Sequence, residues 1–239
     1  VTMDNIYRPD ICFFAKLPQR IKSFLFGGLV IAFLLYYPHT AAAQTIIPLY
    51  EENFINDQAE GWDLREGWVL DGEELIGDGP AWAYYGGGPW GDGFHFFEFD
   101  LTALSREGIL HAGVQHSEVG RYIIGIEQVG ENGLIVYLEK QYWDGGTQRI
   151  AAWDSREESQ AAYDLKCPYH VSVEFGDGNF AVFLRSECEQ LILPEPILTA
   201  FDNQPLPPGA ISFESLEETD YVMIDNVVLF GPQNKPETD

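Results

Sequence analysis

Aromatic side chains crowd one short stretch of the sequence, "PAWAYYGGGPWGDGFHFF", which runs from Pro80 to Phe97. If this stretch is extended, Trp82 and Tyr84 share one face, because successive side chains of a strand alternate. Trp90 follows three glycines and a proline, so we expect it on a loop between two strands. Exposed rings can stack on the C–H groups of a sugar or another flat ligand. The alternative is that these rings are core residues of a β-sandwich.

Two other features belong with these aromatic residues. Trp143 lies in a second glycine-containing loop, "YWDGG". In "FHFFEFDL" the carboxylates Glu98 and Asp100 alternate with Phe97 and Phe99, so we expect the two rings in the core and the carboxylates on the opposite face. Carboxylates near aromatic rings suit a carbohydrate site, in which polar atoms bind hydroxyl groups. The predicted ligand-binding residues are Trp82, Tyr84, Trp90, Glu98 and Trp143.

Several motifs of enzymes and metal sites are missing from the sequence. Gly-x-Ser-x-Gly, His-Glu-x-x-His and a Walker loop are all absent, and these motifs mark three large classes of catalytic site. The histidines also lack the close paired spacing of zinc ligands. We therefore expect them to be half-buried strand residues: His95, His111, His116 and His170.

The segment "CPYHVSVEFGDGNFAVFLRSEC" predicts a β-hairpin. Asp177-Gly178 is a preferred two-residue turn, because both of its central positions need positive φ. With this turn, Phe175 faces Phe180, and alternate pairs back to Tyr169 and Ser186 share one face. The same register places Cys167 opposite Cys188 in a non-hydrogen-bonded pair, about 4.5 Å apart at Cα. That distance allows a disulfide, so we predict a Cys167–Cys188 bridge.

The first 43 residues are typical of a secretory signal. Four basic residues precede an apolar run from Phe24 to Tyr37, and three alanines follow it. The run is shorter than the roughly 20 residues that a membrane-spanning helix needs, which favours a signal peptide over a retained anchor. We expect residues 1–43 to be the signal peptide, 44–232 one β-sandwich domain and 233–239 a disordered tail. The protein would then be secreted, periplasmic or cell-surface, where disulfides persist.

The chain is strongly acidic, with a formal net charge of −25. The leader holds four Lys or Arg and two Asp or Glu, so residues 44–239 hold nine basic and 36 acidic residues and carry −27. Nucleic acids and anionic membrane surfaces are polyanions, and this charge argues against both as partners.

Short β-rich segments separated by Gly, Asp, Asn or Pro recur along the rest of the chain, among them "GRYIIGIEQ", "GLIVYLEKQYW" and "GAISFES". Only residues 155–165 hint at a helical period. Strand signals every eight to twelve residues or so predict an all-β, two-sheet antiparallel sandwich of roughly ten to fourteen strands.

The order of these segments resembles the jelly rolls of the concanavalin A-like lectin and glucanase superfamily. The resemblance rests on "ENFINDQAEGWDLREGWVLDGEELIGDG", "RYIIGIEQ", "YHVSVEFGDGNFAVFLRSE" and "LPPGAISFES" with "DYVMIDNVVLF". Within the superfamily the chain is most similar to laminin G-like and 3-keto-disaccharide hydrolase-like exported bacterial domains. The resemblance covers nearly all of residues 49–230 and implies a jelly-roll sandwich, but it includes no diagnostic catalytic signature.

The glucanases of this superfamily carry a Glu-x-Asp-x-x-Glu strand, which supplies the acid and the nucleophile of a retaining mechanism. The corresponding string here is "EFDLTA", with Ala103 in place of the last Glu.

Many jelly rolls of this kind also hold calcium where the first and last strands meet. Hard oxygen ligands are available there, and the predicted calcium ligands are Glu51, Glu52 and Asp225. The alternative is that Asp225 belongs to an ordinary turn or strand edge.

These observations predict an exported, non-catalytic carbohydrate-binding or cell-surface interaction module, with a glycan or cell-surface polymer as its partner. Two alternatives stay open. One is a glycoside-processing hydrolase of the same superfamily. The other is a structural exported subunit whose exposed aromatic residues contact other proteins.

Overall fold

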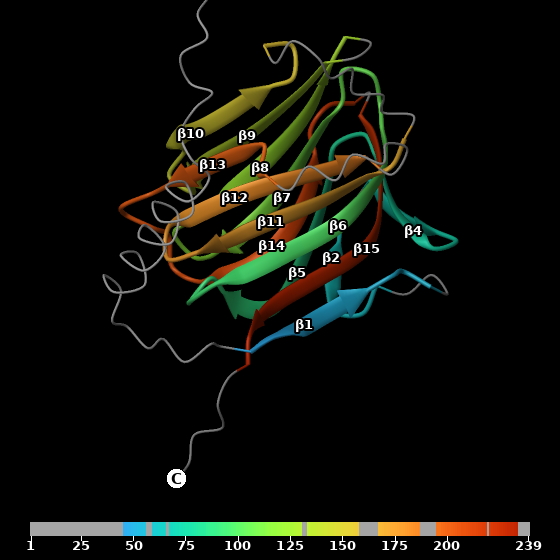
Figure 1. Cartoon of the computed structure of the whole chain (residues 1–239). Coiled ribbons are helices and arrows are strands. Elements are labelled where there is room, and N and C mark those ends of the chain that lie inside the picture. The colour runs from blue at the N-terminus through green and yellow to red at the C-terminus, as the bar shows by residue number, and fades with distance from the viewer. Residues whose placement is uncertain are drawn as a thin grey trace, which may run out of the picture. The chain divides into compact units, whose positions relative to one another are not determined.

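The computed structural model describes residues 45–55, 59–65, 67–130, 133–157, 167–186, 195–218 and 220–233, which belong to one compact unit beginning at Thr45. Within these residues there are fifteen strands, more than the sequence predicted, and no helix that could cross a membrane (Figure 1). The predicted helical segment falls largely outside the described residues. The strands are β1 (Ile46–Glu52), β2 (Trp62–Leu64), β3 (Trp68–Asp71), β4 (Glu74–Asp78), β5 (Ala81–Trp90), β6 (His95–Leu104), β7 (Ile109–His116), β8 (Gly120–Val129), β9 (Gly133–Tyr142), β10 (Thr147–Asp154), β11 (Tyr169–Gly176), β12 (Asn179–Ser186), β13 (Leu198–Phe201), β14 (Gly209–Ser215) and β15 (Tyr221–Pro232).

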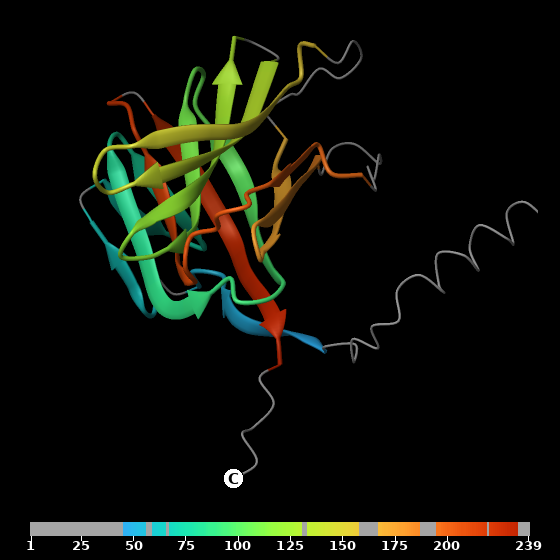
Figure 2. The ribbon, with the colours of Figure 1, turned by 90° about the vertical axis from the view of Figure 1, so that its left-hand side faces the viewer.

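The strands form two antiparallel sheets packed face to face, as the sequence predicted (Figure 2). The seven-stranded sheet has the order β10-β9-β8-β7-β14-β5-β2. The eight-stranded sheet has the order β13-β12-β11-β6-β15-β4-β3, and β1 also pairs with β15. Strands far apart in sequence, such as β14 and β5, are therefore neighbours in each sheet.

Aromatic residues from both sheets meet in the core. Phe97 and Phe99 on β6 are completely buried, as their alternation with carboxylates predicts. Their ring centroids lie 5.5 and 5.0 Å from that of Phe213, which comes from the opposite sheet. Burying each such side chain contributes roughly 1.5–3 kcal/mol, so alternation along β6 and β14 is a main source of stability for the sandwich.

The predicted β11–β12 hairpin is confirmed in register. Phe175 pairs with Phe180 and Tyr169 with Ser186, and the turn has the positive φ values expected of Asp177 and Gly178. Cys167 lies two residues before β11, whereas Cys188 is outside the described residues. The Cys167–Cys188 bridge therefore stays a prediction.

Two bulges distort the seven-stranded sheet at one end. In β5 the run from Gly86 to Pro89 is inserted between Tyr85, which pairs with Ile211, and Trp90, which pairs with Gly209. In β7 a bulge at Gln115, whose φ is +49°, shifts the register against β14. Bulges of this kind bend a strand and redirect its side chains.

The prediction that Trp90 lies on a loop is wrong. Trp90 is the last residue of β5, only 8% of it is exposed, and it belongs to the hydrophobic core. Its ring stacks on Tyr85 with centroids 5.6 Å apart and planes inclined by 10°. The inserted glycines and proline are absorbed by the bulge, so the strand resumes and carries Trp90 inward.

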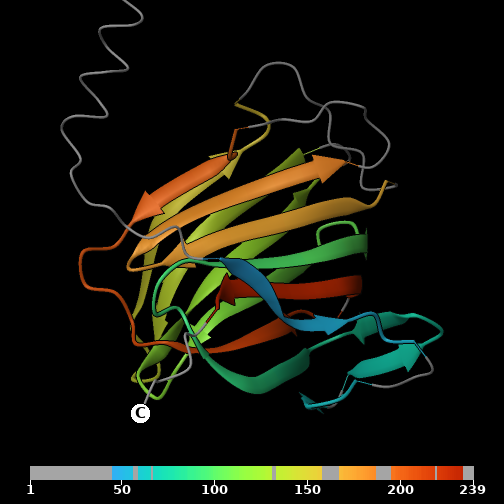
Figure 3. The same ribbon diagram turned by 60° about the horizontal axis from the view of Figure 1, so that its bottom comes forward.

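The first and last strands of this unit are side by side. β1 pairs with β15 from Ile46 opposite Pro232 to Glu52 opposite Val227. Figure 3 shows this pairing, with β1 in blue beside β15 in red. The backbone N–H of Gln233 also donates to the carbonyl of Thr45 at 2.9 Å. The two ends of the described chain thus leave the sandwich at the same edge.

Candidate functional site

A row of aligned residues, most of them polar or aromatic, crosses the outer face of the seven-stranded sheet. The strand register aligns one position from each of five neighbouring strands, β5, β14, β7, β8 and β9. These positions, in order across the sheet, are Trp82, Glu214, His111, Gly125 and Tyr137. Sheet pairing rather than sequence proximity therefore brings these residues together.

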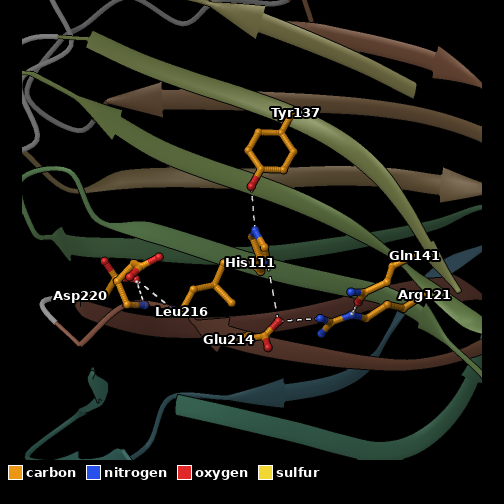
Figure 4. Close-up of polar contacts among 8 residues, drawn as sticks. His111, Arg121, Tyr137, Gln141, Glu214, Leu216 and Asp220 are labelled. Atoms are coloured by element: carbon orange, nitrogen blue, oxygen red, sulfur yellow. Dashed lines mark hydrogen bonds and ion pairs between the residues drawn. The ribbon is translucent and has the colours of Figure 1, made fainter. Parts of the chain in front are cut away.

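Polar contacts link this row into a continuous network (Figure 4). The hydroxyl of Tyr137 and Nε2 of His111 are 2.7 Å apart, and Nδ1 of His111 lies 3.5 Å from Oε2 of Glu214. The same oxygen accepts a hydrogen bond of 2.6 Å from Nη2 of Arg121, whose Nε donates to Gln141 at 2.8 Å. Glu214 is thus the carboxylate at the centre of the network.

Gly125 makes room for the contact between Tyr137 and His111. These residues lie on β9 and β7, and β8 runs between them. A Cβ atom added at Gly125 would approach the ring of Tyr137 to 2.0 Å. The absence of a side chain there lets the tyrosine lie flat across β8 and reach the histidine.

Arg121 is enclosed between two indole rings. Its guanidinium carbon lies 4.6 Å from the ring centroid of Trp82 and 5.8 Å from that of Trp143. Only 4% of its side chain is exposed. Cation–π contacts of a desolvated guanidinium can contribute about 2 kcal/mol, so Arg121 and the two tryptophans hold one another in place.

His116 lies at the centre of an aromatic cluster. Its ring centroid is 5.4 Å from that of Trp82, 4.9 Å from that of Tyr84 and 4.8 Å from that of Trp143. Burial, assisted by the charge of Arg121, lowers the pKa of His116 to about 4. At neutral pH this imidazole is therefore uncharged, with one nitrogen as donor and the other as acceptor.

A pocket of about 580 Å³ opens beside this cluster. Tyr84 and His116 form one part of its wall, the β5 bulge from Gly86 to Pro89 forms another, and the β7–β8 turn and residues 207–210 complete it. Trp143 does not line the pocket, but its indole, 44% exposed, is tied to the wall residue Ser117, whose carbonyl accepts a hydrogen bond of 2.7 Å from Nε1. Aromatic and apolar walls with a few polar groups are typical of small-ligand sites of this size.

The structure brings together three of the five predicted ligand-binding residues. Trp82, Tyr84 and Trp143 all belong to the aromatic cluster, although they come from β5 and the β9–β10 turn. Trp90 is in the core, as described above. Glu98 lies on the other sheet, where it accepts a hydrogen bond of 3.1 Å from Ser172.

The sequence patterns do not predict His116, Arg121 or Glu214 as site residues. His116 reaches the outer face only because of the bulge at Gln115, whose amide lies 3.4 Å from the carbonyl of Leu206 on the inner side. Arg121 on β8 reaches Glu214 on β14 because both strands pair with β7. A charged residue within a predicted strand indicates a buried ion pair only when the fold shows which opposite charge it meets.

A second polar cluster occupies the outer face of the eight-stranded sheet. Nδ1 of His170 lies 2.8 Å from Asp100, and Nε2 lies 3.8 Å from Glu98. Asn226 also donates to Asp100, at 2.8 Å. These contacts engage both carboxylates of "EFDLTA" with neighbours on β11 and β15.

The predicted calcium ligands come from the paired strands β1 and β15. Oε1 of Glu52 accepts the backbone N–H groups of Asn53 and Phe54 at 3.1 and 3.0 Å, and Oε2 accepts the hydroxyl of Tyr50 at 3.2 Å. Among the described residues, no group of three or more His, Cys, Asp or Glu is arranged to hold a metal ion. A calcium site formed by Glu51, Glu52 and Asp225 stays a prediction.

Comparison with known proteins gives structural neighbours only. No family model matches the sequence, and no curated protein matches it. Among solved structures, it is similar to SCLam, a non-specific endo-β-1,3(4)-glucanase of family GH16, at 8% identity over 82% of this chain and 95% of that chain, with a TM-score of 0.56. It is also similar to the CBM2 module of the evolved Dit protein of Lactobacillus casei BL23 phage J-1, at 8% identity over 80% and 98%, with a TM-score of 0.54.

A third neighbour is the exoplasmic, lumenal domain of VIP36 in its Ca²⁺ and Man3GlcNAc-bound form. The identity is 12% over 79% of this chain and 93% of that chain, with a TM-score of 0.50. At such low identity these likenesses establish the fold and no more. Together with the two antiparallel sheets, they show that the chain has the concanavalin A-like jelly-roll fold.

Proposed function

We propose that this protein is an exported carbohydrate-binding module whose ligand occupies the pocket beside Tyr84, His116 and Trp143. The observation that carries the proposal is an aromatic cluster from three separate segments beside one pocket of about 580 Å³. Tyr84 and His116 line the pocket, and the ring of Trp143 packs against His116. A pocket of that volume can hold sugar-sized groups. Trp143, 44% exposed, offers a stacking surface, and the neutral imidazole of His116, whose Nδ1 is buried, has Nε2 left to offer to a hydroxyl group.

The structural neighbours support this proposal at the level of ligand class. One is a glucanase, one is a phage CBM2 module and one is bound to Man3GlcNAc. All three are named for glycan substrates, a carbohydrate module or a bound glycan. Because fold likeness alone is a weak warrant for function, the proposal depends on the pocket and its rings.

Binding without hydrolysis is favoured by the state of Glu214, the carboxylate of the network. Burial opposes its ionisation, but the neighbouring imidazole of His111 and the charge of Arg121 outweigh burial and hold the pKa of Glu214 below its usual range. A glycosidase acid needs the opposite, a carboxyl that stays protonated near the working pH. Glu214 therefore suits the role of a fixed anion that orients Arg121 and His111.

Affinity electrophoresis against a panel of soluble polysaccharides tests the proposal. We expect retention by at least one polysaccharide, and at least about a tenfold weaker affinity for Trp143→Ala, which corresponds to about 1.4 kcal/mol. Tyr221→Ala is the matched control, because Tyr221 is a similarly exposed aromatic residue on the other sheet. No retention by any polymer, or equal effects of the two substitutions, would contradict the proposal.

The two alternative functions give different results in the same experiment. A hydrolase releases new reducing ends from the polymer that retains it. A structural subunit self-associates, or binds another protein, without retention by any glycan. Incubating the retaining polymer with the protein and measuring reducing ends therefore separates binding from turnover.

A further inference from the structure

The walls of the pocket carry little charge, and that charge is negative. Among the described lining residues, one is a histidine, His116, and one is a carboxylate, Glu118. None of them is Lys or Arg. His116 is uncharged at neutral pH. Glu118 is exposed and lies on the β7–β8 turn at the mouth of the pocket. An anionic ligand therefore meets a carboxylate and no cation on these walls.

Arg121 lies next to the aromatic cluster but is not available to a ligand anion. Its Nη2 is bound to Glu214 at 2.6 Å and its Nε to Gln141 at 2.8 Å. Its Nη1 has no hydrogen-bond partner, yet this atom is buried, and the indoles of Trp82 and Trp143 flank the guanidinium. A ligand could reach Nη1 only if one of these rings moved.

The net charge of the whole chain also disfavours anionic ligands. Its formal net charge of −25 repels polyanions at long range, and a cavity wall without a cation offers no local compensation. Desolvating a carboxylate or sulfate without a partner costs several kcal/mol. Hydroxyl groups avoid this cost, because they carry no charge and can pair with the imidazole of His116 and the hydroxyl of Tyr84, which both line the pocket.

We propose that the pocket selects uncharged sugar residues and excludes glycans that carry uronate or sulfate groups. This inference rests on the proposed function, since it specifies the ligand of the same pocket. The exclusion has two sources, the carboxylate of Glu118 at the mouth and the absence of an accessible cation on the described walls.

Chemically matched polymers test this selectivity. The neutral polysaccharide that retains the protein most strongly is compared with its own carboxymethyl and hydroxyethyl derivatives at equal degrees of substitution. Both substituents add similar bulk, but only the carboxymethyl group adds charge. At low salt we expect the carboxymethyl polymer to bind at least about tenfold more weakly than the hydroxyethyl polymer, and added salt to reduce this difference.

Two glutamine variants locate the source of the exclusion. Glu118→Gln should bring the affinities for the two derivatives closer together. Glu73→Gln, which makes the same charge change at an exposed hairpin of the other sheet, should leave the difference unchanged. Equal or tighter binding of the carboxymethyl polymer by the wild type overturns the selectivity, while sensitivity to Trp143→Ala still supports the carbohydrate site. Failure of every polymer to retain the protein overturns the proposed function and the selectivity with it.

Discussion

Arg121 carries a full positive charge in a place that water hardly reaches, since only 4% of its side chain is exposed. Glu214, 19% exposed, supplies the compensating charge at 2.6 Å. A buried pair of this kind adds little net stability over apolar residues, but removing one partner leaves the other as an unpaired buried charge. The pair therefore stabilises the arrangement of the outer face only when it is complete.

We expect Glu214→Ala to lower the free energy of unfolding by about 3–5 kcal/mol, because it leaves the Arg121 charge unpaired. Urea unfolding of the wild type and the variant measures the difference. Glu139→Ala is the matched control, since its partner Arg149 is 47% exposed and such surface pairs contribute at most about 1 kcal/mol. Similar losses for the two variants would show that Arg121 does not depend on Glu214.

His170 is expected to make stability depend on pH. Its hydrogen bond with Asp100 outweighs burial and raises the pKa of His170 above the ordinary 6.5. A pKa that is higher in the folded state gives a stabilising contribution that is complete below the unfolded-state pKa. This contribution is lost as the pH rises through the folded-state pKa.

Urea unfolding at a series of pH values measures this effect. From about pH 6 upward, the free energy of unfolding of the wild type should contain a falling component that His170→Gln lacks. Parallel pH profiles for the two proteins would mean that His170 titrates equally in the folded and unfolded states.

At the scale of the strands, the small residue at Gly125 allows the polar network to cross β8. We expect Gly125→Ala to displace the ring of Tyr137 and to cost about 1–3 kcal/mol through overpacking. Gly146→Ala is the control, because a Cβ there would have its closest contact, 3.3 Å, with the side chain of Asp144. The near-ultraviolet circular dichroism spectrum should change for Gly125→Ala and not for the control. An unchanged stability and spectrum for both would contradict this role of Gly125.

The predicted Cys167–Cys188 disulfide would close the open end of the β11–β12 hairpin. The confirmed register, extended by two residues beyond Tyr169 and Ser186, places Cys167 opposite Cys188. Counting free thiols on the unfolded, unreduced protein without residues 1–43 should give none, and reduction should expose two. Two thiols before reduction would exclude the bridge.

The hairpin could be predicted from the sequence, whereas the end of β5 could not. Asp177-Gly178 and the alternating residues around it act locally, so a short segment contains all the information that the pairing needs. In β5 the glycines and Pro89 favour a loop by every local rule. The strand resumes at Trp90 because Gly209 on β14 pairs with it, and a partner so far along the chain is not visible in a local pattern.

For the candidate site, too, the sequence predicts local features but not the contacts between distant strands. Alternation alone puts Trp82 and Tyr84 on one face, and the structure agrees. The sequence does not reveal that β14 lies between β5 and β7, and this order brings Glu214 beside Trp82. It also does not reveal the bulge that turns His116 outward.

At the scale of the whole molecule, the pairing of the first and last strands places Glu51 and Glu52 opposite Val228 and Val227, a short distance along β15 from Asp225. Burial, together with Asp100 and other nearby carboxylates, raises the pKa of Asp225. If calcium binds Glu51, Glu52 and Asp225, it should neutralise this charge and raise the melting temperature. Thermal melts with excess calcium and with a chelator test this, and identical melting temperatures would contradict the predicted site.

The position of β14 also determines when the outer face of the seven-stranded sheet, the proposed binding face, can form. The face consists of one part on β2 and β5 and another on β7 to β10, and β14 is the strand that joins them. Its pairings with β5 and β7 close long stretches of chain, and contacts of this kind form slowly. During synthesis, β5 and β7 are made well before β14, so the nascent chain holds Trp82 and His116 without the strand that brings them together. The ability to retain a glycan would then appear as one of the last events of folding.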